Sequence, residues 1–138
     1  MGLAVSKTNG TVETSPVYVS SFGVTSICRD AIEFHLIGDQ LYAGEEIVST
    51  VPGLPYQQLA ANLPKGTINS GFSLAKNGLG WLDANFTSSG ATFCLSTSGK
   101  VLAVFDSFNQ PDNCIHVGLK STPRKVSHSQ VYLFHMPK

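Results

Sequence analysis

Charged residues are scarce in this chain, and those that are present cancel. Nine Lys and Arg residues balance nine Asp and Glu residues, and charged side chains make up 13% of the 138 residues. A nucleic-acid-binding protein needs a basic face to neutralise phosphates, and attachment to an anionic membrane surface needs a basic cluster. The composition therefore argues against nucleic acid and against a membrane as partners.

Long apolar runs are also missing, and so are the features of a targeting segment. No apolar run approaches the roughly 20 residues of a membrane span. The first 15 residues have neither a basic start nor a sustained apolar stretch, so they do not read as a signal peptide. Two sequons, at Asn9 and Asn85, are candidate N-glycosylation sites. Together with abundant Ser, Thr and Gly, they lead us to expect a mature, secreted, monomeric domain.

Cysteine is limited to three residues, Cys28, Cys94 and Cys114. We expect Cys94 and Cys114 to form a disulfide, because one lies on a central hairpin and the other opens a later strand. Closing a loop of this length contributes roughly 3 kcal/mol in the chain-entropy model. Cys28 is then expected to be a buried free thiol, and no helix is predicted after it that would activate it as a nucleophile.

Residues with catalytic or metal-binding chemistry are few and dispersed. The four histidines, His35, His116, His128 and His135, show no spacing typical of a metal site. We therefore expect no metal, no cofactor and no enzymatic activity.

The sequence does contain repeated signals for β-hairpins. Apolar and polar residues alternate in residues 72–81 and 93–105, around the turn sequences Asn77-Gly78 and Ser98-Gly99, and residues 34–43 repeat the pattern. The first two units start 38 residues apart, at Phe34 and Phe72, close to one repeat of a β-trefoil. We predict a flexible arm over residues 1–15 and one all-β domain over residues 16–138, a β-trefoil with a β-sandwich as the alternative.

The longest irregular segment covers residues 45–66. Three prolines exclude a regular central strand there, and the residues after Pro55 could form either a short helix or a strand over residues 57–60. Ordered loops on rigid β scaffolds are where binding residues concentrate. The candidate binding residues are those of the uncharged, proline-braced loop 49–58: Val51, Pro52, Leu54, Pro55 and Tyr56.

The single tryptophan, Trp81, has two interpretations. An exposed Trp could stack on a sugar ring, with Tyr42 or Tyr56 as further glycan contacts. A Trp between Leu79 and Leu82 on a central hairpin is more simply a core residue, which is the interpretation we favour.

Several short motifs resemble the fungal secreted cell-wall proteins that include the phialide protein and IgE-binding allergens. The similarity spans residues 17–119, with two departures. The family's second Trp is replaced around Leu102, and Cys94-Leu95 stands where the family usually has Cys-Pro. The matching positions are Val51-Pro52-Gly53 with Gln57-Gln58, Ser70 to Ser73, Gly80-Trp81, Cys94, Val101 to Phe105 and Cys114. The resemblance implies secretion by a fungus, residence in the cell wall or a host apoplast, and no enzymatic activity.

Small β-rich fungal proteins of this kind include effectors and β-trefoil inhibitors of papain-like cysteine proteases. We therefore expect a non-enzymatic, effector-type protein whose loop 49–58 enters the apolar cleft of such a protease. A carbohydrate-binding or structural cell-wall module is the alternative function.

Overall fold

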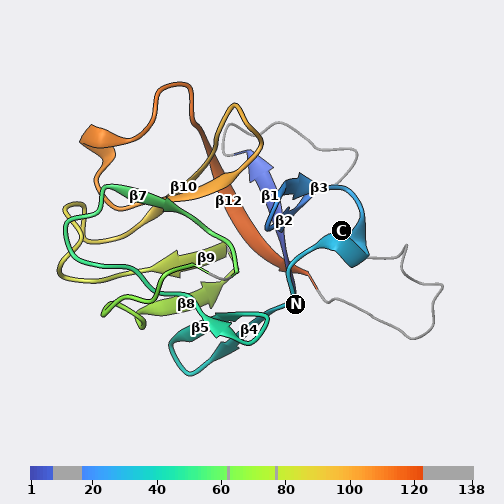
Figure 1. Ribbon diagram of the computed structural model, residues 1–138, viewed down its shortest axis with the longest axis horizontal. Coiled ribbons are helices and arrows are strands. Elements are labelled where there is room, and N and C mark those ends of the chain that lie inside the picture. The colour runs from blue at the N-terminus through green and yellow to red at the C-terminus, as the bar shows by residue number, and fades with distance from the viewer. Residues whose placement is uncertain (8–16, 62, 77, 123–138) are drawn as a thin grey trace.

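A computed structural model describes residues 1–7, 17–61, 63–76 and 78–122. Within these residues the chain forms twelve strands and two short 3₁₀ helices, η1 (Cys28–Asp30) and η2 (Ser107–Asn109), and no α-helix. The predicted all-β class is confirmed. Figure 1 shows the strands gathered around a strongly curled sheet.

The strands form three antiparallel sheets. A three-stranded sheet contains β4 (Phe34–Ile37), β5 (Gln40–Ala43) and β6 (Glu46–Ile47), and a two-stranded sheet contains β8 (Phe72–Ala75) and β9 (Gly78–Trp81). The largest sheet has seven strands, in the order β3 (Gly23–Thr25), β2 (Val17–Ser20), β1 (Gly2–Lys7), β12 (Ile115–Thr122), β10 (Thr92–Leu95), β11 (Val101–Val104) and β7 (Tyr56–Gln58).

The seven-stranded sheet curls until its two edges approach each other. At the β3 edge, the Val24 N–H donates to the Gly99 carbonyl oxygen at 2.7 Å, in the turn between β10 and β11. At the β7 edge, the Gln58 side-chain amide donates to the Ser21 carbonyl oxygen at 3.3 Å. These contacts partly satisfy edge groups that would otherwise be open to pairing with another chain.

All three predicted hairpins are present, but they are not equivalent. The hairpins β4–β5 and β8–β9 have the same alternation of buried and exposed side chains, and the Phe72 N–H donates to the Asp39 carbonyl oxygen at 3.0 Å, which joins them. In the third hairpin, β10–β11, all four residues of β11 are buried. Alternate residues of β11 pack in two different clusters, Val101 and Ala103 in the main core and Leu102 and Val104 in a second cluster with the disulfide cysteines.

Trp81 is the centre of the hydrophobic core, as favoured from the sequence. It is fully buried, its ring stacks on Phe72 at a centroid distance of 4.2 Å, and it meets Phe86 and Phe105 edge-on at 5.4 and 5.2 Å. Its indole N–H donates to the Ser70 carbonyl oxygen at 3.0 Å. The glycan-stacking interpretation of Trp81 is therefore wrong.

The predicted flexible arm over residues 1–15 is wrong for its first half. Residues 2–7 form β1, which lies between β2 and β12 inside the seven-stranded sheet. Leu3 and Val5 are buried, whereas Ala4 and Ser6, which follow them, are only partly buried, so a short period-two pattern was present in the sequence. The rest of the arm, residues 8–15, lies outside the described residues.

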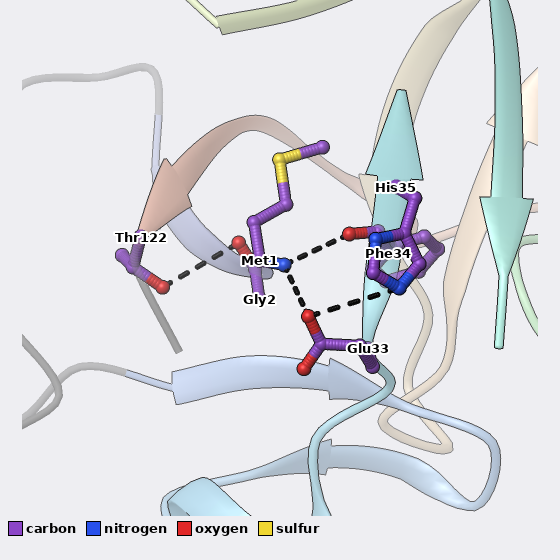
Figure 2. Close-up of polar contacts among 6 residues, drawn as sticks. All are labelled: Met1, Gly2, Glu33, Phe34, His35 and Thr122. Atoms are coloured by element: carbon purple, nitrogen blue, oxygen red, sulfur yellow. Dashed lines mark hydrogen bonds and ion pairs between the residues drawn. The ribbon is translucent and has the colours of Figure 1, made fainter. Parts of the chain in front are cut away.

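Polar contacts tie the first residues to two neighbouring strands (Figure 2). The Met1 amino group lies 2.6 Å from the Glu33 carboxylate and 2.8 Å from the Phe34 carbonyl oxygen. His35 Nε2 is 4.0 Å from the same carboxylate oxygen, and the Thr122 hydroxyl donates to the Gly2 carbonyl oxygen at 3.4 Å. These contacts fix β1 against β4 and the end of β12.

Of the two alternatives for the segment after Pro55, the strand is correct and the helix is wrong. Residues 56–58 form β7, whose register pairs Gln57 with Ala103 of β11. Edge pairing explains the result, because a strand at a sheet edge tolerates the flanking prolines. His128 and His135 lie outside the described residues.

Candidate functional site

The candidate site is the loop between β6 and β7, whose tip is formed by residues 51–54. On its N-terminal side, Thr50 and Ile68 exchange two backbone hydrogen bonds of 2.9 Å. The Ser49 hydroxyl accepts from the Gly66 N–H, and the Ser49 carbonyl oxygen accepts from the Gln57 side-chain amide, both at 2.8 Å. Ser49 and Thr50 are buried, so this base of the loop is held rigidly.

The C-terminal side of the loop is held by Pro55. Its carbonyl oxygen accepts from the backbone N–H groups of Phe105 at 2.8 Å and Asp106 at 3.1 Å. Between the two bases, Pro52 and Gly53 form the turn, and Gly53 has φ +90°. Pro-Gly suits a type II turn, because proline fixes the first central residue and the second requires positive φ.

The predicted binding residues are divided between the turn and the adjoining strand. Val51, Pro52 and Leu54 are exposed on the turn, with 43% exposure for Val51 and 37% for Leu54, and Pro55 is half-buried. Tyr56, expected in the extended loop, instead belongs to β7 and lies opposite Val104, with 37% of its surface exposed. The structure therefore presents a four-residue apolar tip rather than the ten-residue loop inferred from the sequence.

A second loop lies beside the first and was not selected from the sequence. Residues 106–113 connect β11 to β12, and they meet the first loop where the Asp106 backbone N–H donates to the Pro55 carbonyl oxygen at 3.1 Å. In Figure 1 the short helical turn η2, drawn in orange, lies on the same side of the molecule as the start of β7. Its central residue, Phe108, is 88% exposed. A single Phe within the polar sequence DSFNQPDN was the available signal.

The second loop is also rigidly held. The Asp106 carboxylate caps η2, accepting from the Phe108 N–H at 3.1 Å and from the Asn109 side-chain amide at 2.7 Å. At its far end the loop runs into Cys114, which forms the predicted disulfide with Cys94, with Cα atoms 5.4 Å apart.

The disulfide belongs to a small apolar cluster on the face of β11 that is turned away from the main core. Leu102 and Val104 pack there with Cys94 and Cys114. Tyr56 lies directly opposite Val104 in the register of β7 and β11, and directly opposed residues project from the same face of a sheet. Tyr56 therefore lies on the same face of the sheet as this buried cluster, and the two loops are joined where the Asp106 backbone N–H donates to the Pro55 carbonyl oxygen.

The other predicted sites are placed as follows. Asn85 is exposed, with its side-chain amide donating to Asp83 at 3.1 Å, and Thr87 of the same sequon is also exposed. Asn9 and the side chain of Cys28 lie outside the described part of the structure. Tyr42 is half-buried on β5.

Titratable and metal-binding chemistry is sparse in the described part of the chain. No group of three His, Cys, Asp or Glu side chains there could hold a metal ion. Burial raises the pKa of Tyr18 above its ordinary value, because the phenolate would have to form in an apolar environment. None of the helical turns in the described residues is long and apolar enough to cross a membrane.

Comparison with known proteins gives a family but no relative of known activity. No curated protein and no solved structure matches the chain. One family model does match, over residues 4–125, and its description is a domain of unknown function. Because the match covers most of the chain, from β1 beyond the end of β12, the protein belongs to the DUF7908 family.

Proposed function

We propose that this protein is a secreted fungal effector that inhibits a papain-like cysteine protease by inserting the turn 51–54 into the enzyme's cleft. The observation that carries the proposal is the contrast between an exposed apolar tip and its two fixed bases. Val51 and Leu54 are exposed, while Thr50 and Pro55 on either side are tied by backbone hydrogen bonds to Ile68, Phe105 and Asp106.

Rigid presentation matters because a flexible loop loses conformational entropy when it binds. Ordering each rotamer-rich side chain or loop residue reduces affinity, and a loop already held in one conformation avoids most of that loss. The turn 51–54 carries no charged residue, and none occurs anywhere from residue 47 to residue 64. An uncharged, apolar turn is suited to a cleft with hydrophobic subsites and needs no desolvation of ions.

We also propose that the fold is a β-trefoil rather than a β-sandwich. Two hairpins that start 38 residues apart share one burial pattern, and they lie against a sheet whose edges approach each other. A sandwich would normally leave two separate sheets with open edges.

The alternative, a carbohydrate-binding or structural wall module, loses its leading residue because Trp81 is buried in the core. Tyr56 and Tyr42 remain as aromatic side chains that could contact a glycan. No observation favours this alternative over the inhibitor.

The test is inhibition of papain by the wild type and by the double variant Val51→Ser, Leu54→Ser. Burying the remaining exposed parts of these two side chains is worth about 1 kcal/mol each, so the double variant should inhibit about 30-fold more weakly. Tyr56 is left intact because it lies in β7. Ile37→Ser is the matched control, since Ile37 is an exposed apolar residue on the separate hairpin β4–β5. Equal inhibition by all three proteins would overturn the assignment of the turn.

A further inference from the structure

The second loop has three properties that the proposed function does not use. It holds the most exposed aromatic residue on this side of the molecule, Phe108, on a capped turn. It is anchored at one end to Pro55 and at the other to the disulfide. It also carries two carboxylates, Asp106 and Asp112.

Exposure of a large aromatic side chain on a rigid turn is unfavourable for an isolated protein. Phe108 is 88% exposed, and no aromatic contact is recorded for it among the described residues. Its backbone is nevertheless fixed by the Asp106 cap, so its position relative to the turn 51–54 is set before any partner arrives. A preorganised aromatic side chain next to a second apolar anchor is the typical composition of a binding hot spot.

Both loops and the loop 83–90, where the Ser88 N–H donates to the Phe105 carbonyl oxygen at 3.3 Å, carry charge of one sign. Residues 51–54, 83–90 and 106–113 contain no Lys or Arg, and Lys65, near the base of the first loop, lies 3.8 Å from the Glu46 carboxylate. The only acidic residues of these three loops are Asp83, Asp106 and Asp112, and no ion pair within the described residues involves any of them. The apolar anchors are thus accompanied by carboxylates that no described cation neutralises.

We propose that Phe108 is a second anchor of the same contact surface, and that the partner is a protein whose apolar cleft is flanked by basic side chains. This inference rests on the proposed function and specifies the partner's chemistry. Phe108 fills an apolar subsite beside the one entered by Val51 and Leu54, and Asp112 faces the basic rim. Complementary rim charges act mainly on the association rate and make it depend on salt.

The experiment measures inhibition of papain by Phe108→Ser, with Phe22→Ser as the matched control. Phe22 is equally exposed, at 93%, but lies in the turn between β2 and β3. Phe108→Ser should weaken inhibition about 30-fold, the effect of losing one hot-spot residue. Phe22→Ser should leave inhibition unchanged, and both variants should keep the wild-type melting curve because both side chains are on the surface.

The charge is tested with Asp112→Asn at about 50 and 500 mM NaCl, where the Debye length falls from about 14 to about 4 Å. The variant should associate several-fold more slowly than the wild type at low salt and equally fast at high salt. An association rate that depends neither on salt nor on Asp112 would refute the proposal that basic side chains flank the partner's cleft.

If the double variant Val51→Ser, Leu54→Ser loses inhibition while Phe108→Ser retains it, Phe108 is not a second anchor and the proposed function stands. A wild type that does not inhibit papain overturns both.

Discussion

Replacing Trp81 by alanine removes the side chain around which the core is packed. A buried Trp withdraws about 150–250 Å² from water, and at about 25 cal/mol per Å² this burial stabilises the fold by roughly 4–6 kcal/mol. Alanine recovers part of that burial, so the expected loss in the free energy of unfolding is about 3–5 kcal/mol. The loss should lie at the upper end, because three aromatic rings contact Trp81 and the Ser70 carbonyl oxygen loses its donor.

Unfolding in urea would be monitored by far-UV circular dichroism. Tryptophan fluorescence cannot be used, because the alanine variant lacks the only Trp of the chain. The control is Trp81→Phe, which keeps an aromatic ring against Phe72 and Phe105 but cannot donate to Ser70. Its loss should be smaller, about 1–3 kcal/mol, reflecting the unpaired carbonyl and a partly filled site. A loss below about 1.5 kcal/mol for the alanine variant would show that the ring is not packed as described.

Three further predictions concern other parts of the fold. Removing the disulfide with Cys94→Ser, Cys114→Ser should lower the free energy of unfolding by about 3 kcal/mol, and an unchanged urea midpoint would contradict this. Gly71→Ala should lose at least 2 kcal/mol more than Gly38→Ala, because both glycines have positive φ but only at Gly71 would a Cβ overlap a backbone oxygen; equal melting temperatures would refute the overlap. Because burial raises the pKa of Tyr18 above 10.0 in the folded state, the unfolded state loses its proton first, so the contribution of Tyr18 to stability should be constant below pH 10 and should be lost as the pH rises above it. Tyr18→Phe should remove that part of the alkaline loss, and an identical pH profile for the two proteins would contradict it.

The strength of each local signal explains how much of the fold could be predicted. Hairpins β4–β5, β8–β9 and β10–β11 were predictable because alternation and a glycine turn coincide within a dozen residues. Strand β1 was missed because its pattern, Leu3 and Val5, is too short to separate from a polar arm, and its partner β12 lies more than 100 residues away. Register between distant strands is set by packing and cannot be read from a local pattern.

The candidate site shows the same limit. The loop 49–58 was selected from the sequence, but the turn at Pro52-Gly53 was not, although proline and glycine together favour that geometry. Its rigidity was not visible, since the bonds that hold it come from Ile68 and Phe105, which are distant in sequence. Phe108 was passed over for the same reason: its relation to the turn arises only when β11 pairs with β7.

The central claim, insertion of the turn 51–54 into a protease cleft, is tested most directly by the kinetic pattern of inhibition. Initial rates of papain on a peptide substrate would be measured across a range of substrate and wild-type concentrations. We expect competitive inhibition with a dissociation constant below about 1 μM, corresponding to a binding free energy of about −8 kcal/mol or better. Activity that is unchanged at ten times that concentration, or inhibition that is independent of substrate, would contradict the claim.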